Sequence, residues 1–374
     1  MGYGVDVESV VREYFNVGKV SSAEGFYEFV VIGDISEDDL NERFDALYDE
    51  LISAGYAVLL ASAGSNVVLR VFYIGTPKKG ALLSIVMTVA TAVSVFLTGY
   101  LQTLSFNDAV SRLQKLGADL GGMDPFISAF LFLLAVLVPL MLHELGHTFV
   151  ARSTGVPADL PTPIPAPVIS PLGTFGAIIR MRYLPKRLKY LAELGISGPV
   201  IGVTASALLF VLFLMTSPTL PYNIAEKAAS SGLLGYVTVT PMLAYALIGT
   251  LGEGSVVILT PPALASMLIL MLHFANLVPI GQLDGGHVFR ALTSTGVHRA
   301  AGIASFAVLI ILGVLFPQML WLSIFAILAM FLTGSRPHIG AANTLSRLDE
   351  KDKLIFGILY AVLLLLTFPV PLIG

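Results

Sequence analysis

The chain of 374 residues has no cysteine, and charged side chains make up only 12% of it. The lack of cysteine excludes a disulfide scaffold, thiolate metal ligands and a cysteine nucleophile. Soluble domains carry about 25% charged residues, whereas 56% of this chain is hydrophobic. The composition therefore excludes an ordinary soluble protein and an intrinsically disordered one.

The few charges are unevenly distributed along the chain. Residues 1–79 contain 13 acidic and 6 basic side chains, a net charge of −7, whereas the remainder carries +3. An acidic N-terminal part followed by an apolar, weakly basic remainder argues against a nucleic-acid partner. We therefore divide the chain into an N-terminal domain, residues 1–79, and a transmembrane domain, residues 80–374.

The N-terminal domain has the pattern of a small soluble α+β fold. Early acidic residues without an apolar core segment argue against a signal peptide. Ser36, followed by three acidic residues, predicts the N-cap of a helix. Three β-branched or alternating runs predict strands, at residues 26–32, 56–61 and 67–73.

From residue 80 onward, long uncharged stretches reach about the 20 residues that a helix needs to cross a membrane. They are residues 80–107, 125–143, 194–225, 254–283, 300–335 and 354–374. A single helix over 300–335 would be roughly 54 Å long, too long for a core of about 30 Å. We therefore expect a turn at Pro317. The sequence predicts a polytopic α-helical membrane protein with about six or seven transmembrane helices.

Basic residues predict the orientation of these helices. Most Lys and Arg residues fall in loops between the uncharged stretches, and the positive-inside rule places these loops and the N-terminal domain in the cytosol. A full crossing by residues 233–252 would put Arg290 on the wrong side. We therefore predict that residues 233–252 form a re-entrant or interfacial segment.

A second irregular segment follows the second predicted span. Residues 157–173 are rich in proline, and residues 174–183 then have the pattern of a strand ending in alternating Arg180 and Arg182. Such backbone is tolerated at membrane depth only where it is buried in protein or lines a wet cavity. We therefore expect this strand to border a cavity.

The sequence His143-Glu144-Leu145-Gly146-His147 carries the main chemical signal. On a helix, the two histidines stand one turn apart and can bind one metal ion, with Glu144 as general base. Burying a carboxylate in mid-membrane costs roughly 2.5–3.5 kcal/mol. Metal binding, worth about 10–16 kcal/mol at structural zinc sites, offsets that cost, so a chance match explains the motif poorly.

A catalytic zinc site needs a third protein ligand and an open position. Asp284 is the only acidic residue in 254–289, and it lies about as far from Arg290 as His147 lies from Arg152. The two motifs can therefore meet at one depth. The alternative for Asp284 is a helix cap at the membrane surface. His287 is either a competing ligand or a residue beside the site or at its cytosolic rim.

Other polar residues in apolar runs are weaker candidates. Asn276 precedes Pro279, which frees a backbone carbonyl. Its amide could donate to a developing oxyanion or to substrate backbone, or it could form an interhelical hydrogen bond. We expect His273 to pack between helices or to form a helix–helix hydrogen bond, and His298 and His338 to be solvated. Close helix packing is predicted at Gly195, Gly198 and Gly202.

These motifs resemble those of the site-2 protease family of intramembrane zinc metalloproteases, especially its archaeal, cyanobacterial and chloroplast branch. The likeness covers residues 143–147, 173–177 and 276–287, and more weakly 368–371. The resemblance implies that Glu144 is the catalytic base and that Asn276 assists the substrate or the transition state. It also implies one zinc ion per chain, bound by His143, His147 and Asp284.

The resemblance implies an activity as well: hydrolysis of peptide bonds within or near the transmembrane segments of single-pass membrane proteins. The predicted strand offers an edge for an extended substrate. Candidate substrate-binding residues are Phe175, Gly176, Ile178 and Asn276. Residues 1–79 replace the PDZ insert of many bacterial relatives, and we expect them to regulate the enzyme or recruit substrate.

Two other functions compete with this interpretation. A catalytically silent pseudoprotease that binds membrane partners would lack the glutamate or a ligand, and all are present here. A metal transporter would need polar residues along several helices, and few occur outside the two motifs. Proteolysis is therefore the preferred prediction. Nothing in the sequence specifies an oligomeric state.

Overall fold

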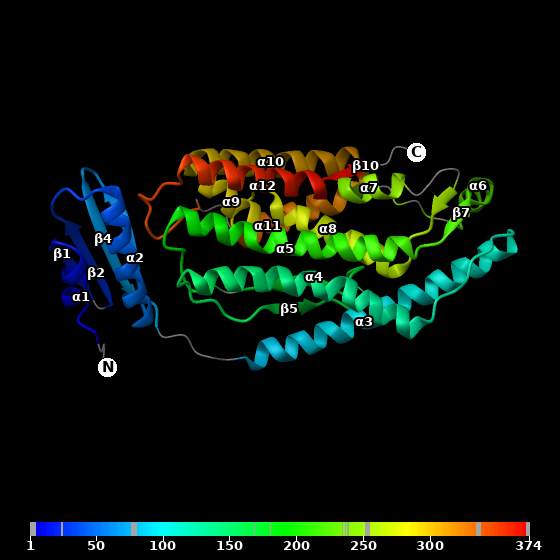
Figure 1. Ribbon diagram of the computed structural model, residues 1–374, viewed down its shortest axis with the longest axis horizontal. Coiled ribbons are helices and arrows are strands. Elements are labelled where there is room, and N and C mark those ends of the chain that lie inside the picture. The colour runs from blue at the N-terminus through cyan, green and yellow to red at the C-terminus, as the bar shows by residue number, and fades with distance from the viewer. Residues whose placement is uncertain are drawn as a thin grey trace.

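The computed structural model describes residues 5–371 except 24, 76–80, 168, 180, 234, 236, 238, 251–254 and 334–337. The predicted domain boundary at 76–79 lies outside the described residues, as do Arg180 and Arg336. The molecule is elongated, with an α+β region at one end of a bundle of helices (Figure 1).

The N-terminal region is a four-stranded antiparallel sheet with two helices. In spatial order the strands are β1 (Val17–Ala23), β2 (Phe26–Val31), β4 (Asn66–Tyr73) and β3 (Tyr56–Ala63). Helix α2 (Glu37–Ser53) begins as predicted, because the Ser36 hydroxyl accepts a hydrogen bond from the Asp39 N–H. The three predicted strands are confirmed, whereas α1 (Val7–Tyr14) and β1 were not predicted. Helix α1 is short and rich in valine, a β-branched residue.

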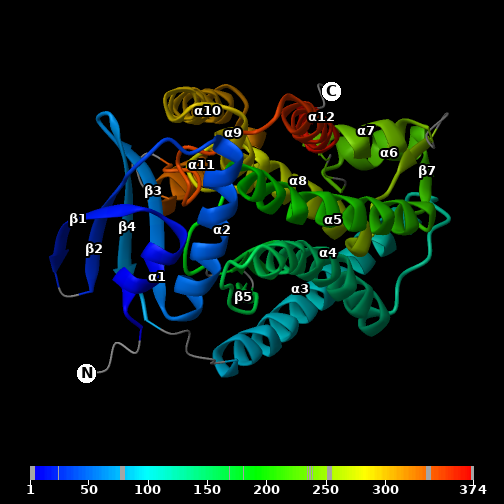
Figure 2. The same cartoon turned by 60° about the vertical axis from the view of Figure 1, so that its left-hand side comes forward.

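This region docks on the helical part through two docking segments, residues 183–187 and 341–346. Leu60 of β3 donates its N–H to the carbonyl oxygen of Ala342 and accepts from the N–H of Thr344. The ring of Tyr183 and the side chain of Ala342 join the apolar core of the region. Figure 2 shows α2 on the side of the sheet that faces the bundle. The sheet and the helices are thus tied by backbone pairing as well as by apolar contacts.

Ion pairs between α2 and the first docking segment complete the interface. Asp49 pairs with Lys186 at 2.7 Å, and Asp45 pairs with Arg187 at 2.6 Å. Burial raises the pKa of the Asp45 carboxyl, against the opposing effect of the Arg187 guanidinium. The acidic face of α2 therefore covers part of the basic segment formed by residues 183–187.

Within the described residues, four helices are long and apolar enough to cross a membrane. They are α3 (Leu82–Lys115), α4 (Pro125–Ser153), α5 (Leu188–Met215) and α10 (Thr295–Leu315). The predicted count of six or seven spans is not confirmed. Two further apolar helices are shorter, namely α8 (Pro261–Leu277) and α11 (Leu320–Thr333). The helix α12 (Glu350–Thr367) begins with four charged residues.

Prolines set several helix ends. Helix α10 stops at Leu315, and the 3-10 turn η1 (Pro317–Met319) separates it from α11, so the predicted turn at Pro317 is confirmed. Helix α8 stops at Leu277, two residues before Pro279. The carbonyl oxygen left free at Leu277 accepts a hydrogen bond from the Tyr360 hydroxyl of α12 at 2.7 Å.

The segment around residues 233–252 contains no long helix in its described part. Helix α7 (Met242–Gly249) has eight residues, about 12 Å of rise, which agrees with the prediction that it does not cross fully. Short elements surround it at the end of the bundle far from the N-terminal sheet (Figure 1). They are β7 (Thr219–Pro221), α6 (Tyr222–Ser230), β8 (Val239–Pro241), β9 (Ser255–Val257) and β10 (Pro369–Pro371).

A small hairpin and a short helix complete the frame of the site. Strands β5 (Thr162–Pro165) and β6 (Thr174–Ile178) pair antiparallel, which confirms the first half of the strand predicted over 174–183. The hairpin lies beside α3 and α4. Helix α9 (Asp284–Leu292) packs on α5, which also contacts α4, α8 and α12. Helix α5 is therefore the central element of the bundle.

Candidate metal centre

The two motif histidines lie side by side in the interior of the bundle. His143 and His147 occupy one face of α4, a turn apart, and both side chains are buried. Their Nε2 atoms are 3.1 Å apart. His147 Nδ1 lies 2.7 Å from the carbonyl oxygen of Leu194 on α5. Since a carbonyl can only accept, Nδ1 carries the proton and donates, leaving the Nε2 lone pair free for a metal.

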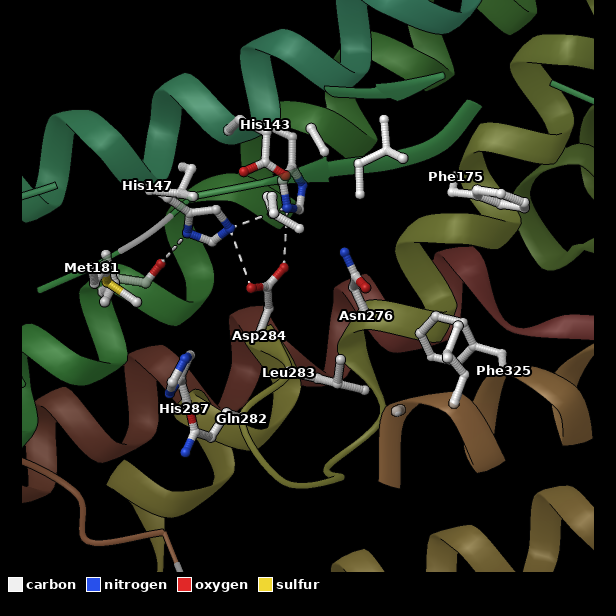
Figure 3. Close-up of a pocket in the computed structure, with 18 residues that line it drawn as sticks. His143, His147, Phe175, Met181, Asn276, Gln282, Leu283, Asp284, His287 and Phe325 are labelled. Carbon is white, nitrogen blue, oxygen red and sulfur yellow. Dashed lines mark hydrogen bonds and ion pairs between the residues drawn. The ribbon is translucent and has the colours of Figure 1, made fainter. Parts of the chain in front are cut away.

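Asp284 meets the two histidines from the opposite side of the cavity. The chain turns after α8, with Gly281 at φ +53°, a conformation that favours glycine. Asp284 is the first residue of α9, and the cap position is Leu283. Its Oδ2 lies 3.1 Å from His143 Nε2 and its Oδ1 lies 3.2 Å from His147 Nε2 (Figure 3). The carboxylate therefore faces the histidines and does not cap its helix.

The Nε2 atoms of the two histidines lie 3.1 Å apart, and each lies 3.1–3.2 Å from a different oxygen of the Asp284 carboxylate. A tetrahedral zinc site with bonds of about 2.0–2.2 Å separates its ligand atoms by roughly 3.3–3.6 Å. The observed distances are therefore close to those of such a site. His143, His147 and Asp284 thus form a possible metal-binding site with two nitrogen donors and one carboxylate, a donor set that suits zinc.

Glu144 shares the cavity with the three donors. Its side chain is buried and lines the same cavity, which has a volume of about 630 Å³. A carboxylate next to a three-donor metal set is the arrangement that a general base requires. The rest of the wall is mostly apolar and includes Ile164, Phe175, Ile178, Leu283, Phe325 and Leu328.

Three of the four residues predicted to contact substrate line this cavity. Figure 3 shows the Asn276 amide pointing into it beside Asp284, with Phe175 farther along the wall. Ile178 also lines it. Gly176 is not among the lining residues; it is buried, with φ +98°. The contact of these residues with a substrate stays a prediction.

Three further histidines, His287, His298 and His338, form a largely buried group near the site. His287 lines the cavity. Its Nδ1 atom faces His338 and lies 2.8 Å from the Nε2 atom of that residue. His298 and His338 are only 4% and 5% exposed, so the prediction that they are solvated is wrong. The chain after α11 returns to the bundle, where buried Arg290 donates to the carbonyl oxygens of His338 and Ile339. The basic residues near His298 and His338 in the sequence could not show that the chain returns to the bundle and buries these histidines.

Sequence reasoning missed the role of the glycines on α5. It predicted close packing at these positions, but not that each one faces a part of the metal site. Gly195 lies against the Asp284 backbone, Gly198 against the His147 ring, and Gly202 against the His143 side chain. A spacing of three and four residues places the glycines along one side of the helix. The spacing could be recognised in the sequence, but the residues that the glycines face could not.

Together, the fold and the site define a class of protein. The described residues contain four helices of membrane length, and two buried histidines meet an aspartate beside a glutamate inside the bundle. These features describe a multi-pass membrane protein with a candidate metallopeptidase centre. The chain belongs to peptidase family M50, because the model of that family matches residues 131–318, half of the chain.

Curated relatives agree with this assignment. The chain is 30% identical over 159 residues to the probable chloroplastic zinc metalloprotease EGY2 of Arabidopsis thaliana, covering 41% of this chain and 27% of that protein. It is 28% identical over 198 residues to EGY1 of the same plant, covering 51% and 35%. A zinc metalloprotease of Methanocaldococcus jannaschii is 28% identical over 166 residues, covering 44% and 35%. The matched part thus spans about a quarter to a third of the relatives' length. No solved structure matches the chain.

Proposed function

We propose that the protein is an intramembrane zinc metalloprotease that cleaves membrane-anchored substrates within or near their transmembrane segments. The observation that carries the proposal is the meeting of His143, His147 and Asp284 beside Glu144 in one buried cavity. Membership of peptidase family M50 and the zinc metalloproteases among the relatives support it. One zinc ion per chain follows from the three donors.

Each residue of the cavity has a role in the proposed hydrolysis. His143, His147 and Asp284 would hold the zinc ion, which when bound would supply Lewis-acid polarisation of the scissile carbonyl and lower the pKa of water. Glu144 takes a proton from the attacking water and delivers it to the leaving nitrogen. Asn276 donates an amide N–H to the substrate carbonyl or backbone. The apolar wall strengthens these electrostatic interactions by lowering the local dielectric.

The hairpin gives the cavity a place for an extended substrate. A substrate helix must unwind locally, because its amides are otherwise bonded within the helix. Strand β6 has one strand neighbour, β5, in the sheet that the structure describes. Its other edge can pair with an unwound segment, while Phe175 and Ile178 supply apolar contacts. Single-pass membrane proteins are the class of partner that this geometry suits.

The orientation and the N-terminal region belong to the same proposal. By the positive-inside rule, the basic loops support a cytosolic position for the docked N-terminal region and the nearby end of the cavity. Residues 1–79 would regulate the protease or recruit its substrates. Their contacts with both docking segments support this role, because those segments lead directly into α5 and α12.

The substitution Glu144→Gln tests the proposal on a membrane-embedded substrate in vesicles. We expect at least a 100-fold loss of cleavage with zinc retained, because the amide cannot take a proton whereas the three donors are unchanged. Glu193→Gln is a matched control, since this half-buried carboxyl does not line the cavity. A wild-type protein that binds zinc but cleaves nothing would favour the catalytically silent binding protein.

A further inference from the structure

The two histidines of the candidate metal centre are supported differently. Histidines that bind a metal usually donate their second ring N–H to an acceptor, which fixes the orientation of the ring. His147 follows this rule through the carbonyl oxygen of Leu194. His143 Nδ1 is buried and has no hydrogen-bond partner among the described residues. Among the described residues, His143 therefore lacks the hydrogen-bond acceptor that His147 has.

The ring of His273 lies directly against His143. His273 comes from α8 and is 2% exposed. Its ring centroid lies 4.9 Å from that of His143, and the two planes differ by only 18°. These values fall within the range of offset-stacked aromatic pairs. The contact covers one face of the His143 ring with a second planar ring.

Helix α5 closes the other side of this pair. A Cβ added at Gly202 would lie 2.5 Å from His273 Cε1 and 2.9 Å from His143 Cβ. Real Cβ atoms do not approach other atoms so closely, so only glycine leaves room for both side chains. The backbone of α5 therefore restricts the movement of both rings.

The His273 ring is also tied to the neighbouring helix. It forms a hydrogen bond with the backbone of Gly202 on α5, although Nε2 has no partner by distance and angle among the described residues. That contact keeps the His273 ring in place beside His143. A planar ring in this place can stack on His143, and stacking strengthens when the facing ring shares the charge of a bound cation.

We propose that His273 is a positioning residue that orients His143 for metal binding by stacking on its ring. The proposal rests on the proposed function, because it takes His143 to be a metal ligand. His273 itself is outside the three-donor set and acts only through His143. It takes the place of the hydrogen-bond acceptor that His147 has.

The test compares cobalt binding by the full-length wild-type chain and by His273→Leu and His273→Phe. Cobalt affinity is measured by competition with a chelator, and the visible spectrum reports the geometry of the bound ion. Leucine removes the planar ring, and we expect 10–100-fold weaker binding with an altered spectrum. Phenylalanine keeps a stacking ring, and we expect its spectrum to match the wild type. Met271→Leu is the matched control on the same helix, since Met271 is also buried and lies in an apolar cluster.

The outcomes separate this inference from the proposed function. Equal affinity and an equal spectrum in wild type and His273→Leu would overturn the stacking role alone. A wild-type protein that binds no cobalt would overturn both. If His273→Leu does not fold, His273→Phe decides: an unchanged spectrum supports the inference and an altered one overturns it.

Discussion

At the scale of single residues, the absence of a side chain matters as much as its presence. Gly198 has no Cβ, and the His147 ring occupies the space where one would lie. Glycine costs a helix roughly 0.5–1 kcal/mol relative to alanine. A helix interior accepts that cost where another group must approach the backbone closely, as the His147 ring does here.

Gly198→Ala should therefore damage the metal centre. The added methyl overlaps the His147 ring, so either the ring or α5 must shift, and we expect zinc affinity to fall at least 10-fold. Gly357→Ala is the matched control, since it lies in α12 with nothing within 4 Å of the added Cβ. Metal analysis of both purified variants checks this expectation. Equal zinc content and affinity in the two would contradict it.

At the scale of elements, the proposed substrate pairing depends on one strand edge. Ala177 of β6 lies opposite Pro163 of β5. Proline has no N–H, so this pair cannot exchange two hydrogen bonds. In an antiparallel ladder such a position is a non-hydrogen-bonded pair. The N–H and the carbonyl oxygen of Ala177 therefore point to the free edge of β6.

Ala177→Pro should slow cleavage while the chain keeps its zinc. Proline removes the one N–H that Ala177 can offer to an extended substrate and leaves the three donors in place. Ala177→Val keeps the N–H and serves as the control for side-chain size. Cleavage rate and zinc content are measured together on both variants. Normal turnover in Ala177→Pro would show that the substrate does not use this edge.

At the scale of the whole molecule, the N-terminal sheet is part of the structure that carries the site. The first docking segment leads into α5, which holds Leu194 and the glycine positions. The second lies beyond His338, which contacts His287 three residues after Asp284. A change in the sheet could therefore reach both sides of the metal centre through short connections.

The proposed orientation can be tested with single cysteines, because the natural chain has none. Ser65 is exposed in the turn between β3 and β4, and Ser230 is exposed in α6 at the other end of the bundle. We expect a membrane-impermeant maleimide to label Ser65→Cys only from the cytosolic side and Ser230→Cys only from the opposite side. The unmodified chain is the control for background labelling. The reverse pattern would refute the orientation.

Much of this architecture could be inferred from the sequence, because it depends on local chemistry. Uncharged stretches mark apolar helices whatever surrounds them, Ser36 caps its helix through atoms three residues away, and Pro317 breaks a helix by its own ring. The histidine spacing in α4 follows from the helical repeat alone. These features need no knowledge of where the rest of the chain lies.

The tertiary structure decided what depends on contacts between distant segments. The meeting of Asp284 with His143 and His147 spans more than 130 residues, and stacking of His273 on His143 spans 130. Three other features likewise follow from how the chain returns on itself. They are the burial of His298 and His338, the docking of Leu60 on the second docking segment and the count of long helices. Residue type limits which contacts are favourable, but only the packed fold selects which of them form. The reason is that the burial of a residue depends on its neighbours as much as on its own side chain.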